Sequence, residues 1–185
     1  MITASLSPAT GPLLAAAAVL AVAGLAKLRR PAPTGLALAR LGLPGTDPVV
    51  RALGVLELAA AALATVVGGW AAAPVALLYL GFAAVSTAQV RRAARTGEVA
   101  DCGCFGDSSA PVGWSHVLVN LALAGVAGTA AATGADGVVA GLGDAPVATV
   151  AVALLAVLGA YGIQAVLTDL PALRALRTVD EAAAR

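Results

Sequence analysis

Long runs of apolar residues without a charged side chain dominate this chain. Residues 1–26, 58–90, 108–135 and 145–168 contain no Asp, Glu, Lys or Arg. A helix that crosses the hydrocarbon core of a bilayer needs about 20 mainly apolar residues, so each run is long enough for a crossing. The pattern predicts an all-α integral membrane protein.

The apolar block over residues 51–90 is twice as long as one crossing. Its centre holds Gly68, Gly69 and Pro74, which favour a turn between two helices. We therefore expect a tight helical hairpin here. A single span over the whole block would also scatter the basic clusters over both faces of the membrane.

The remaining segments complete one transmembrane bundle over residues 1–168. Residues 34–43 precede a Pro-Gly turn and suit a short helix lying in the membrane interface. Residues 134–144 are expected to form a loop, and residues 169–185 a charged, helical cytoplasmic tail. The five predicted spans are 11–28, 49–67, 71–90, 114–133 and 145–167.

The composition excludes two broad classes of protein. Apolar residues make up 60% of the chain and charged residues 11%, whereas soluble domains carry roughly 45–50% and about a quarter. The net charge is only +1, and two Trp, two Tyr and two Phe are too few to stack bases along a basic surface. We expect contact with a lipid bilayer and none with nucleic acid.

All eleven Lys and Arg residues fall on one side of this topology. The segments expected on the opposite side, residues 1–10, 68–72 and 134–145, contain none. Because Lys and Arg favour cytoplasmic loops, the sequence predicts a multi-pass protein of the cell (plasma) membrane, with its N-terminus outside and its C-terminus in the cytoplasm. Trp70 and Trp114 then lie at opposite interfaces.

The only two thiols, Cys102 and Cys104, lie in a polar loop before the fourth span. A Cys-x-Cys disulfide closes a small, strained ring, which makes it easier to reduce, and Gly103 relieves enough strain for the bond to form. Arg95 and the N-terminus of the following helix would stabilise a reactive thiolate. The alternative is that both cysteines are inert, buried small side chains. We expect a pair suited to thiol–disulfide exchange.

His116, the only histidine, lies about one turn into the fourth span. It could accept the proton of a cysteine, or bind a metal ion together with Cys102 and Cys104. The spacing Cys-x-Cys-x11-His matches no familiar metal motif. An interfacial histidine bonded to a backbone carbonyl is an equally good interpretation.

Glu57 is the one carboxylate well inside a predicted span. It lies roughly 9 Å below the end of its helix, where an ionised carboxylate is costly unless it is paired. Lys27, at the end of the first span, is the expected partner. The pair would be either functional or purely structural.

Further polar side chains fall in the cytoplasmic halves of spans three, four and five. They predict a polar, partly wet pocket beneath the cysteine loop, with a dry Ala/Leu/Val bundle at the other end. Each one alone more often stabilises helix packing than binds a ligand. The residues are Gln89, His116, Asn120, Tyr161, Gln164 and Thr168.

The order of these features resembles a known family. The first span ends in Gly-Leu-Ala-Lys-Leu-Arg over residues 24–29, and the second carries Leu-Glu-Leu over residues 56–58. Cys-Gly-Cys-Phe-Gly follows at residues 102–106, before a span that contains Asn120. The arrangement is similar to the methylamine utilisation protein MauE family, within the DoxX-like membrane proteins, over roughly residues 11–133.

The resemblance implies a DoxX-like core of four helices, to which this chain adds a fifth. It also implies that Cys102 and Cys104 are a redox pair. The family is associated with maturation of a disulfide-rich dehydrogenase subunit alongside a thioredoxin-like protein. Such a protein and its disulfide substrate are therefore the expected partners.

The leading hypothesis is a membrane thiol–disulfide redox component. A second protein, or a quinone in the polar pocket, would carry the electrons further. A metal-handling protein that uses the cysteines and His116, and a non-catalytic membrane assembly factor, are the alternatives. The charge rule puts the cysteine loop on the cytoplasmic side, whereas an exported substrate requires access from outside. The supporting site residues are His116, Glu57, Lys27, Asn120, Arg95 and Gln89.

Overall fold

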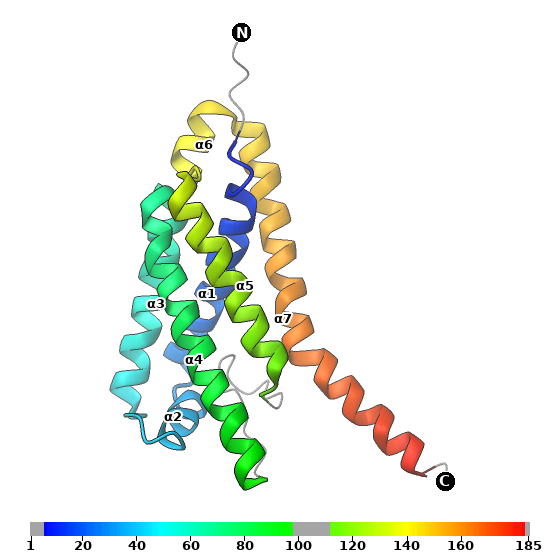
Figure 1. The fold of residues 1–185 in the computed structure, drawn as a ribbon. Coiled ribbons are helices and arrows are strands. Elements are labelled where there is room, and N and C mark those ends of the chain that lie inside the picture. Colours follow the sequence, from blue (N-terminus) through cyan, green and yellow to red (C-terminus); the bar gives the residue numbers. More distant parts are fainter. Residues whose placement is uncertain (1–5, 98–111, 184–185) are drawn as a thin grey trace.

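The computed structural model describes residues 6–97 and 112–183, with side-chain surroundings up to residue 166. The described chain is helical, and its only β-type pairing is an isolated bridge between Gly68 and Asp136. Five long helices form the bundle in Figure 1, with two short helices and one 3₁₀ turn between them. The long helices are α1 (Thr10–Arg29), α3 (Asp47–Val67), α4 (Ala73–Thr96), α5 (Trp114–Thr133) and α7 (Pro146–Ala183). The short elements are α2 (Ala32–Ala39), η1 (Gly69–Ala72) and α6 (Val138–Asp144).

Five helices in the described part of the chain are long and apolar enough to cross a membrane. They are α1, α3, η1 with α4, α5 and the first 21 residues of α7. The predicted fold class, an all-α membrane bundle of about five spans, is confirmed. Large apolar side chains exposed along these helices would face lipid rather than water.

The structure differs from the sequence prediction at two places and confirms it at a third, the helical tail. Helix α4 continues to Thr96, beyond the expected end at residue 90. The expected loop over residues 134–144 is wrong, because Val138–Asp144 form α6 after Gly137, which has an extended backbone conformation. The polar residues after 168 continue α7 without a break to Ala183.

The turn between α3 and α4 falls where the glycines predicted it. Gly68 and Gly69 have φ angles of 70° and 50°, which glycine adopts without the steric cost that a side chain brings. The arms of the hairpin, however, do not pack mainly on each other. Helix α3 lies against α1, and α4 lies against α5. The predicted pair of spans joined by a tight turn is confirmed, and the two arms pack mainly on other helices.

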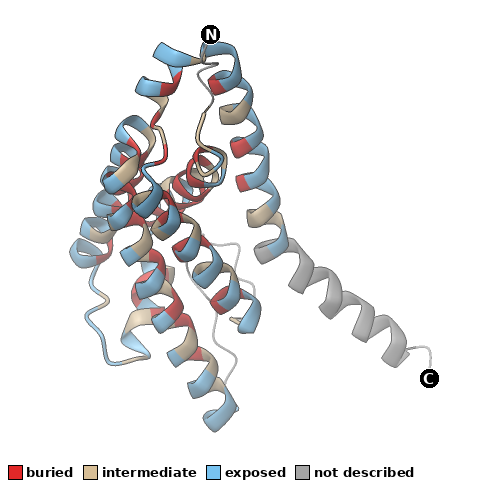
Figure 2. Cartoon of the chain, turned by 45° about the horizontal axis from the view of Figure 1, so that its top comes forward, coloured by how far each residue is buried: buried red, intermediate tan, exposed pale blue. Residues whose placement is uncertain are grey.

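Helix α1 is the centre of the bundle. It contacts α3, α5 and α7, and its apolar core residues are Leu13, Ala16, Ala17, Val19 and Leu20. Figure 2 shows the buried positions concentrated among α1, α3, α4 and α5, whereas the outer face of α7 is exposed. Only 17% of the α7 span is buried, compared with 50% of α1. Helix α7 is therefore peripheral.

The two ends of the bundle differ in charge. Every Lys and Arg between residues 6 and 97 lies where α1 ends, around α2, where α3 begins or where α4 ends. We call this the basic end. The opposite end, where α6 lies in Figure 1, carries Asp136 and Asp144, and we call it the acidic end. There the carboxylate of Asp136 accepts a hydrogen bond of 2.9 Å from the backbone N–H of Ser7.

Two tryptophans lie at opposite ends of the bundle, as predicted. Trp70 belongs to the turn at the acidic end and is 71% exposed, whereas Trp114 opens α5 at the basic end and is 56% exposed. Exposed indole rings favour the interfaces between membrane and water. Their positions fit a bundle that crosses the bilayer along its long axis.

Helices α1 and α3 cross at a pair of glycines. A Cβ atom on Gly24 would lie 2.8 Å from the carbonyl oxygen of Gly54, and a Cβ atom on Gly54 would lie 2.8 Å from the carbonyl oxygen of Gly24. Neither backbone can move away without separating the helices. In a membrane, small residues allow this close approach where no hydrophobic force drives helices together.

We predict that Gly24→Ala and Gly54→Ala each destabilise the bundle by about 1–3 kcal/mol, because the added methyl overpacks the crossing. Gly125→Ala on α5 is the matched control, since a Cβ atom there meets nothing within 4 Å. The control should leave stability unchanged or raise it slightly. Thermal unfolding in detergent, followed by tryptophan fluorescence, measures the difference. Equal unfolding temperatures for Gly54→Ala and Gly125→Ala would contradict the crossing.

Candidate functional site

A buried ion pair joins α1 to α3 near the basic end. Nζ of Lys27 lies 2.9 Å from Oε1 of Glu57, and it donates a hydrogen bond of 3.0 Å to Oε2. The two residues are 2% and 0% exposed. The pairing predicted from the sequence is confirmed. Because neither charge reaches water, each depends on the other for its stability.

One oxygen of this carboxylate is incompletely satisfied. Oε1 of Glu57 is buried and accepts no hydrogen bond from any described residue, so the contact with Nζ of Lys27 is its only polar interaction there. Buried carboxylate oxygens normally accept more than one hydrogen bond. Removal of the lysine would therefore leave the oxygen without compensation.

The glycine crossing puts the pair in place. Lys27 lies three residues after Gly24, and Glu57 lies three residues after Gly54. A Cβ atom on Gly24 would lie 3.1 Å from the Cβ atom of Glu57. A Cβ atom on Gly54 would lie 3.2 Å from the Cβ atom of Lys27. Each charged residue thus packs on the glycine of the opposite helix. Without the glycines the helices would stand too far apart for this contact.

Two aromatic residues of α4 complete the surroundings of Lys27. Its Nζ atom lies 5.1 Å from the ring centroid of Phe82, within the range of a cation–π interaction. The rings of Phe82 and Tyr79 meet edge to face with centroids 6.1 Å apart. The hydroxyl of Tyr79 donates a hydrogen bond of 2.7 Å to the carbonyl oxygen of Ala16. Helix α4 is thereby tied to α1 on the same side as the ion pair.

Sequence reasoning did not identify the four residues that support the ion pair, which are Gly24, Gly54, Tyr79 and Phe82. The glycine that precedes each charged residue by three positions was a usable signal, because that spacing puts both on one helix face. The pair Tyr79 and Phe82 has the same spacing and holds two of the few aromatic residues in the chain. Nothing in the sequence indicates that this face of α4 turns towards Lys27.

His116 and Asn120 hold the first turns of α5. Nδ1 of His116 accepts a hydrogen bond of 3.3 Å from the backbone N–H of Gly113, and the N–H of His116 donates one of 3.0 Å to the carbonyl of Gly113. The amide of Asn120 donates a hydrogen bond of 2.9 Å to the carbonyl of His116. Nδ1 thus accepts from a backbone N–H group, so a bond to a backbone carbonyl, one of the two interpretations of this histidine, is left to Nε2 and stays a prediction.

This bond fixes the role that the imidazole can play. When Nδ1 accepts a hydrogen bond, the proton of a neutral imidazole is on Nε2. His116 is 3% exposed, so it is held in this arrangement inside the bundle end. A neutral His116 is therefore a hydrogen-bond donor through Nε2. To accept a proton it must first give up its bond to Gly113.

Gln89 and Arg95 lie on the same helix but in different surroundings. Gln89 is 3% exposed and follows the buried Ser86 by three residues, which continues the interior face of Tyr79 and Phe82. Arg95 is exposed in the last turn of α4. No hydrogen bond among the described residues joins Gln89 to the Lys27–Glu57 pair. The two are neighbouring features of the basic end rather than one network.

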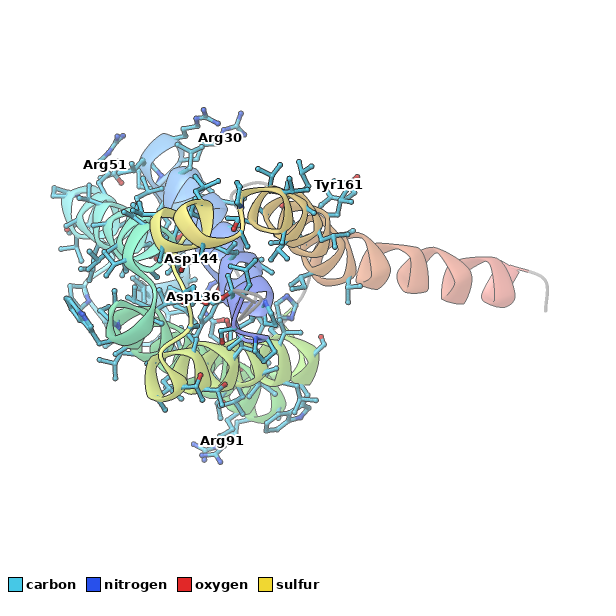
Figure 3. The ribbon with its side chains drawn as sticks, turned by 90° about the horizontal axis from the view of Figure 1, so that it is seen from above. Arg30, Arg51, Arg91, Asp136, Asp144 and Tyr161 are labelled. Atoms are coloured by element: carbon cyan, nitrogen blue, oxygen red, sulfur yellow. The ribbon has the colours of Figure 1, made fainter. Side chains whose placement is uncertain are left out.

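Helix α7 does not contribute to a polar pocket in the way expected. Tyr161 is 72% exposed, and Figure 3 shows it at the outer side of the bundle. Its assignment to the pocket is wrong, because the peripheral α7 turns this face outward. Gln164 is half-buried, and the side chain of Thr168 lies outside the described residues. The buried polar residues Lys27, Glu57, Gln89 and His116 come from α1, α3, α4 and α5.

Cys102 and Cys104 lie outside the described residues, together with the rest of segment 98–111. The described residues on either side, Gly97 and Val112, border α4 and α5 at the basic end. The predicted roles of the two cysteines, as redox pair or as metal ligands with His116, stay predictions. Within residues 6–97 and 112–166, no three His, Asp, Glu or Cys side chains gather as metal ligands would.

The fold and the site define a multi-pass helical membrane protein with an ion pair in its interior. The family model described as methylamine utilisation protein MauE matches residues 5–133. The match covers α1 to the end of α5, which is more than half of the chain, and leaves α6 and α7 outside. The chain belongs to the MauE family, as the sequence motifs indicated. No curated protein and no solved structure matches it.

We predict that Lys27→Met and Glu57→Leu each destabilise the protein by about 3–5 kcal/mol, because each leaves the opposite charge buried and unpaired. The double variant should recover most of this loss, since it removes both charges and keeps the volume apolar. Thermal unfolding of the four proteins in detergent gives the coupling energy as a double-mutant cycle. A double variant no more stable than either single one would contradict the pairing.

Proposed function

We propose that this protein is a membrane thiol–disulfide redox component whose active groups are Cys102 and Cys104. One observation carries the proposal: the Cys-Gly-Cys segment lies within the part of the chain that matches the MauE family, between two helices that end at the basic, polar end of the bundle. Two thiols separated by one glycine, within about ten residues of three arginines in the sequence, suit thiol–disulfide exchange better than a structural role.

The proposed exchange proceeds in two steps. The thiolate of one cysteine attacks a disulfide of a thioredoxin-like partner, so that a mixed disulfide forms and one partner sulfur leaves as a thiolate. The thiolate of the second cysteine then attacks the sulfur of the first cysteine in the mixed disulfide. The second partner sulfur leaves, and Cys102 and Cys104 are joined. Two electrons pass to the partner, whose two thiolates take up two protons. The reverse sequence oxidises the partner with the same balance.

The described residues support a thiolate at this end. Arg95 lies in the last turn of α4, three residues before the undescribed segment begins. The N-terminus of α5 lies just after that segment and carries a partial positive charge. A neutral His116 presents an N–H donor at Nε2. All three favour the charged form of a nearby sulfur over the thiol.

The Lys27–Glu57 pair acts in this proposal by fixing the helices. It locks α1 to α3, and Phe82 ties α4 to the same lysine. Helix α4 leads directly into the cysteine segment. Lys27, Glu57 and Asn120 are therefore positioning residues, which hold the anchors of the segment without touching a substrate.

After exchange with the first partner, the cysteine pair must pass its electrons to, or receive them from, a second redox partner. A second thiol protein is a better candidate for this role than a quinone. The apolar groove of about 450 Å³ between α1, α3 and α7 is lined by aliphatic side chains and Thr65. The hydroxyl of Thr65 donates to the carbonyl of Ala61 in its own helix, so its hydrogen is not free for a quinone oxygen. This groove, among the described residues, fits an aliphatic chain rather than a quinone ring.

The family name gives the metabolic setting from which we infer a substrate. The MauE family is named for methylamine utilisation. We propose that this chain takes part in the maturation of a disulfide-containing protein used in that process. The same exchange would serve other exported disulfide proteins.

The distribution of charge supports an orientation in the cell membrane. We place the basic end and the C-terminus in the cytoplasm and the N-terminus outside, because basic side chains gather at one end. The cysteine segment then starts from the cytoplasmic side. Electrons would reach an exported substrate either through the bundle, from one face to the other, or through a second redox protein.

We predict that Cys104→Ser traps a covalent complex between Cys102 and a thioredoxin-like protein, because the resolving thiol is missing. The complex should run as one band on a non-reducing gel and disappear with dithiothreitol. Cys102→Ser is the reciprocal variant, and the doubly substituted protein is the control. Full function of the doubly substituted protein would contradict the proposal and favour an assembly factor. Stoichiometric zinc or copper that is lost in Cys104→Ser would favour metal handling.

A further inference from the structure

The end of α4 lies at the depth where phospholipid headgroups begin. Trp70 marks the interface at the acidic end, and Arg91 follows it by 21 residues in a nearly continuous helix. At about 1.5 Å per residue the two lie about 32 Å apart, close to the roughly 30 Å thickness of the hydrocarbon core. Arg95 lies about one turn further along. These arginines therefore fall in the opposite headgroup layer.

The same arginines border a hollow on the outside of the bundle. Its volume is about 500 Å³, and α4 supplies one wall while the chain after α2 supplies the other. The residues that line it are Leu41, Ala88, Arg91, Arg92, Arg95 and Thr96.

The charges of this hollow are not neutralised by the described protein. The Lys27–Glu57 pair is the only ion pair among the described residues, so no carboxylate there pairs with Arg91, Arg92 or Arg95. All three are exposed, and Figure 3 shows Arg91 directed away from the bundle. Arg51, at the same end of the bundle, instead donates a hydrogen bond of 2.8 Å to the carbonyl of Leu28. The arginines of α4 are thus exposed to a ligand, and no carboxylate of the described residues competes for them.

The composition of the walls favours a lipid over a free anion. Guanidinium groups bind phosphate oxygens through paired N–H donors. Leu41 and Ala88 give the hollow an apolar wall, and Ala88 lies one turn closer to the bilayer than Arg92. Phosphate at the arginines and glycerol or acyl carbon against this wall match a phospholipid. An inorganic anion would leave the apolar wall uncovered.

We infer that the hollow between α4 and the chain after α2 binds the headgroup of an anionic phospholipid, with Arg91, Arg92 and Arg95 as its phosphate-binding side chains. The site shares Arg95 with the proposed support of the thiolate, but lipid binding there needs neither cysteine. It would anchor the end of α4 at a fixed depth, just before the cysteine segment. Basic clusters at the ends of membrane helices attract anionic lipids in this way.

Native mass spectrometry of the full-length protein in detergent tests the site. We expect retained phosphatidylglycerol, with an apparent affinity at least about tenfold above that for phosphatidylcholine. Arg91→Gln with Arg95→Gln should lower this affinity about fivefold or more. The matched control is Arg29→Gln with Arg40→Gln, which removes the same charge from the same end outside the hollow and should change little. Circular dichroism and unchanged unfolding temperatures confirm that both double variants are folded.

Three results would overturn the inference. An equal loss of phosphatidylglycerol in both double variants would show diffuse attraction to the basic end. Equal retention of phosphatidylglycerol and phosphatidylcholine by the unsubstituted protein would show no charge recognition. Competition by inorganic phosphate at the concentration of the lipid would show a site for free anions.

Discussion

The Lys27–Glu57 ion pair is the interaction on which the rest of the bundle depends. Two charges held away from water are tolerated only when their atoms are in contact, and here Nζ and Oε1 lie 2.9 Å apart. That contact requires a helix separation that the crossing at Gly24 and Gly54 provides. A pair of glycines thus makes a pair of charges possible, and together they fix α1 against α3. Since α1 also contacts α5 and α7, its position determines the arrangement of the other helices.

The ion pair and the family match fall in the same part of the chain. Both lie within residues 5–133, which run from just before α1 to the end of α5. Helix α7 lies beyond this region, is mostly exposed along its span and packs chiefly on α1 and α6. The structure therefore separates a core that holds the polar interior from a peripheral helix that adds apolar surface. In our proposal, the core carries the redox pair and its supports.

The sequence predicted those features that follow from the cost of moving charge into lipid. Runs without charge predicted the five spans, and the isolated position of Glu57 required a cationic partner, for which Lys27 at the end of the first span was the expected residue. What was missed depends on how helices rotate about their axes. Tyr161 was expected inside and lies outside, whereas Phe82 was not considered and lies 5.1 Å from Nζ of Lys27. In a helix that is apolar all round, periodicity does not reveal the buried face.

The cysteine pair is the central claim. Labelling with a membrane-impermeant maleimide, in right-side-out and inside-out membrane vesicles pretreated with oxidised or reduced dithiothreitol, tests it most directly. The account predicts two labels per chain in inside-out vesicles after reduction and none after oxidation. Labels confined to right-side-out vesicles would keep the redox pair and reverse the orientation. Equal labelling after both pretreatments would show that Cys102 and Cys104 form no reversible disulfide, and would contradict the account.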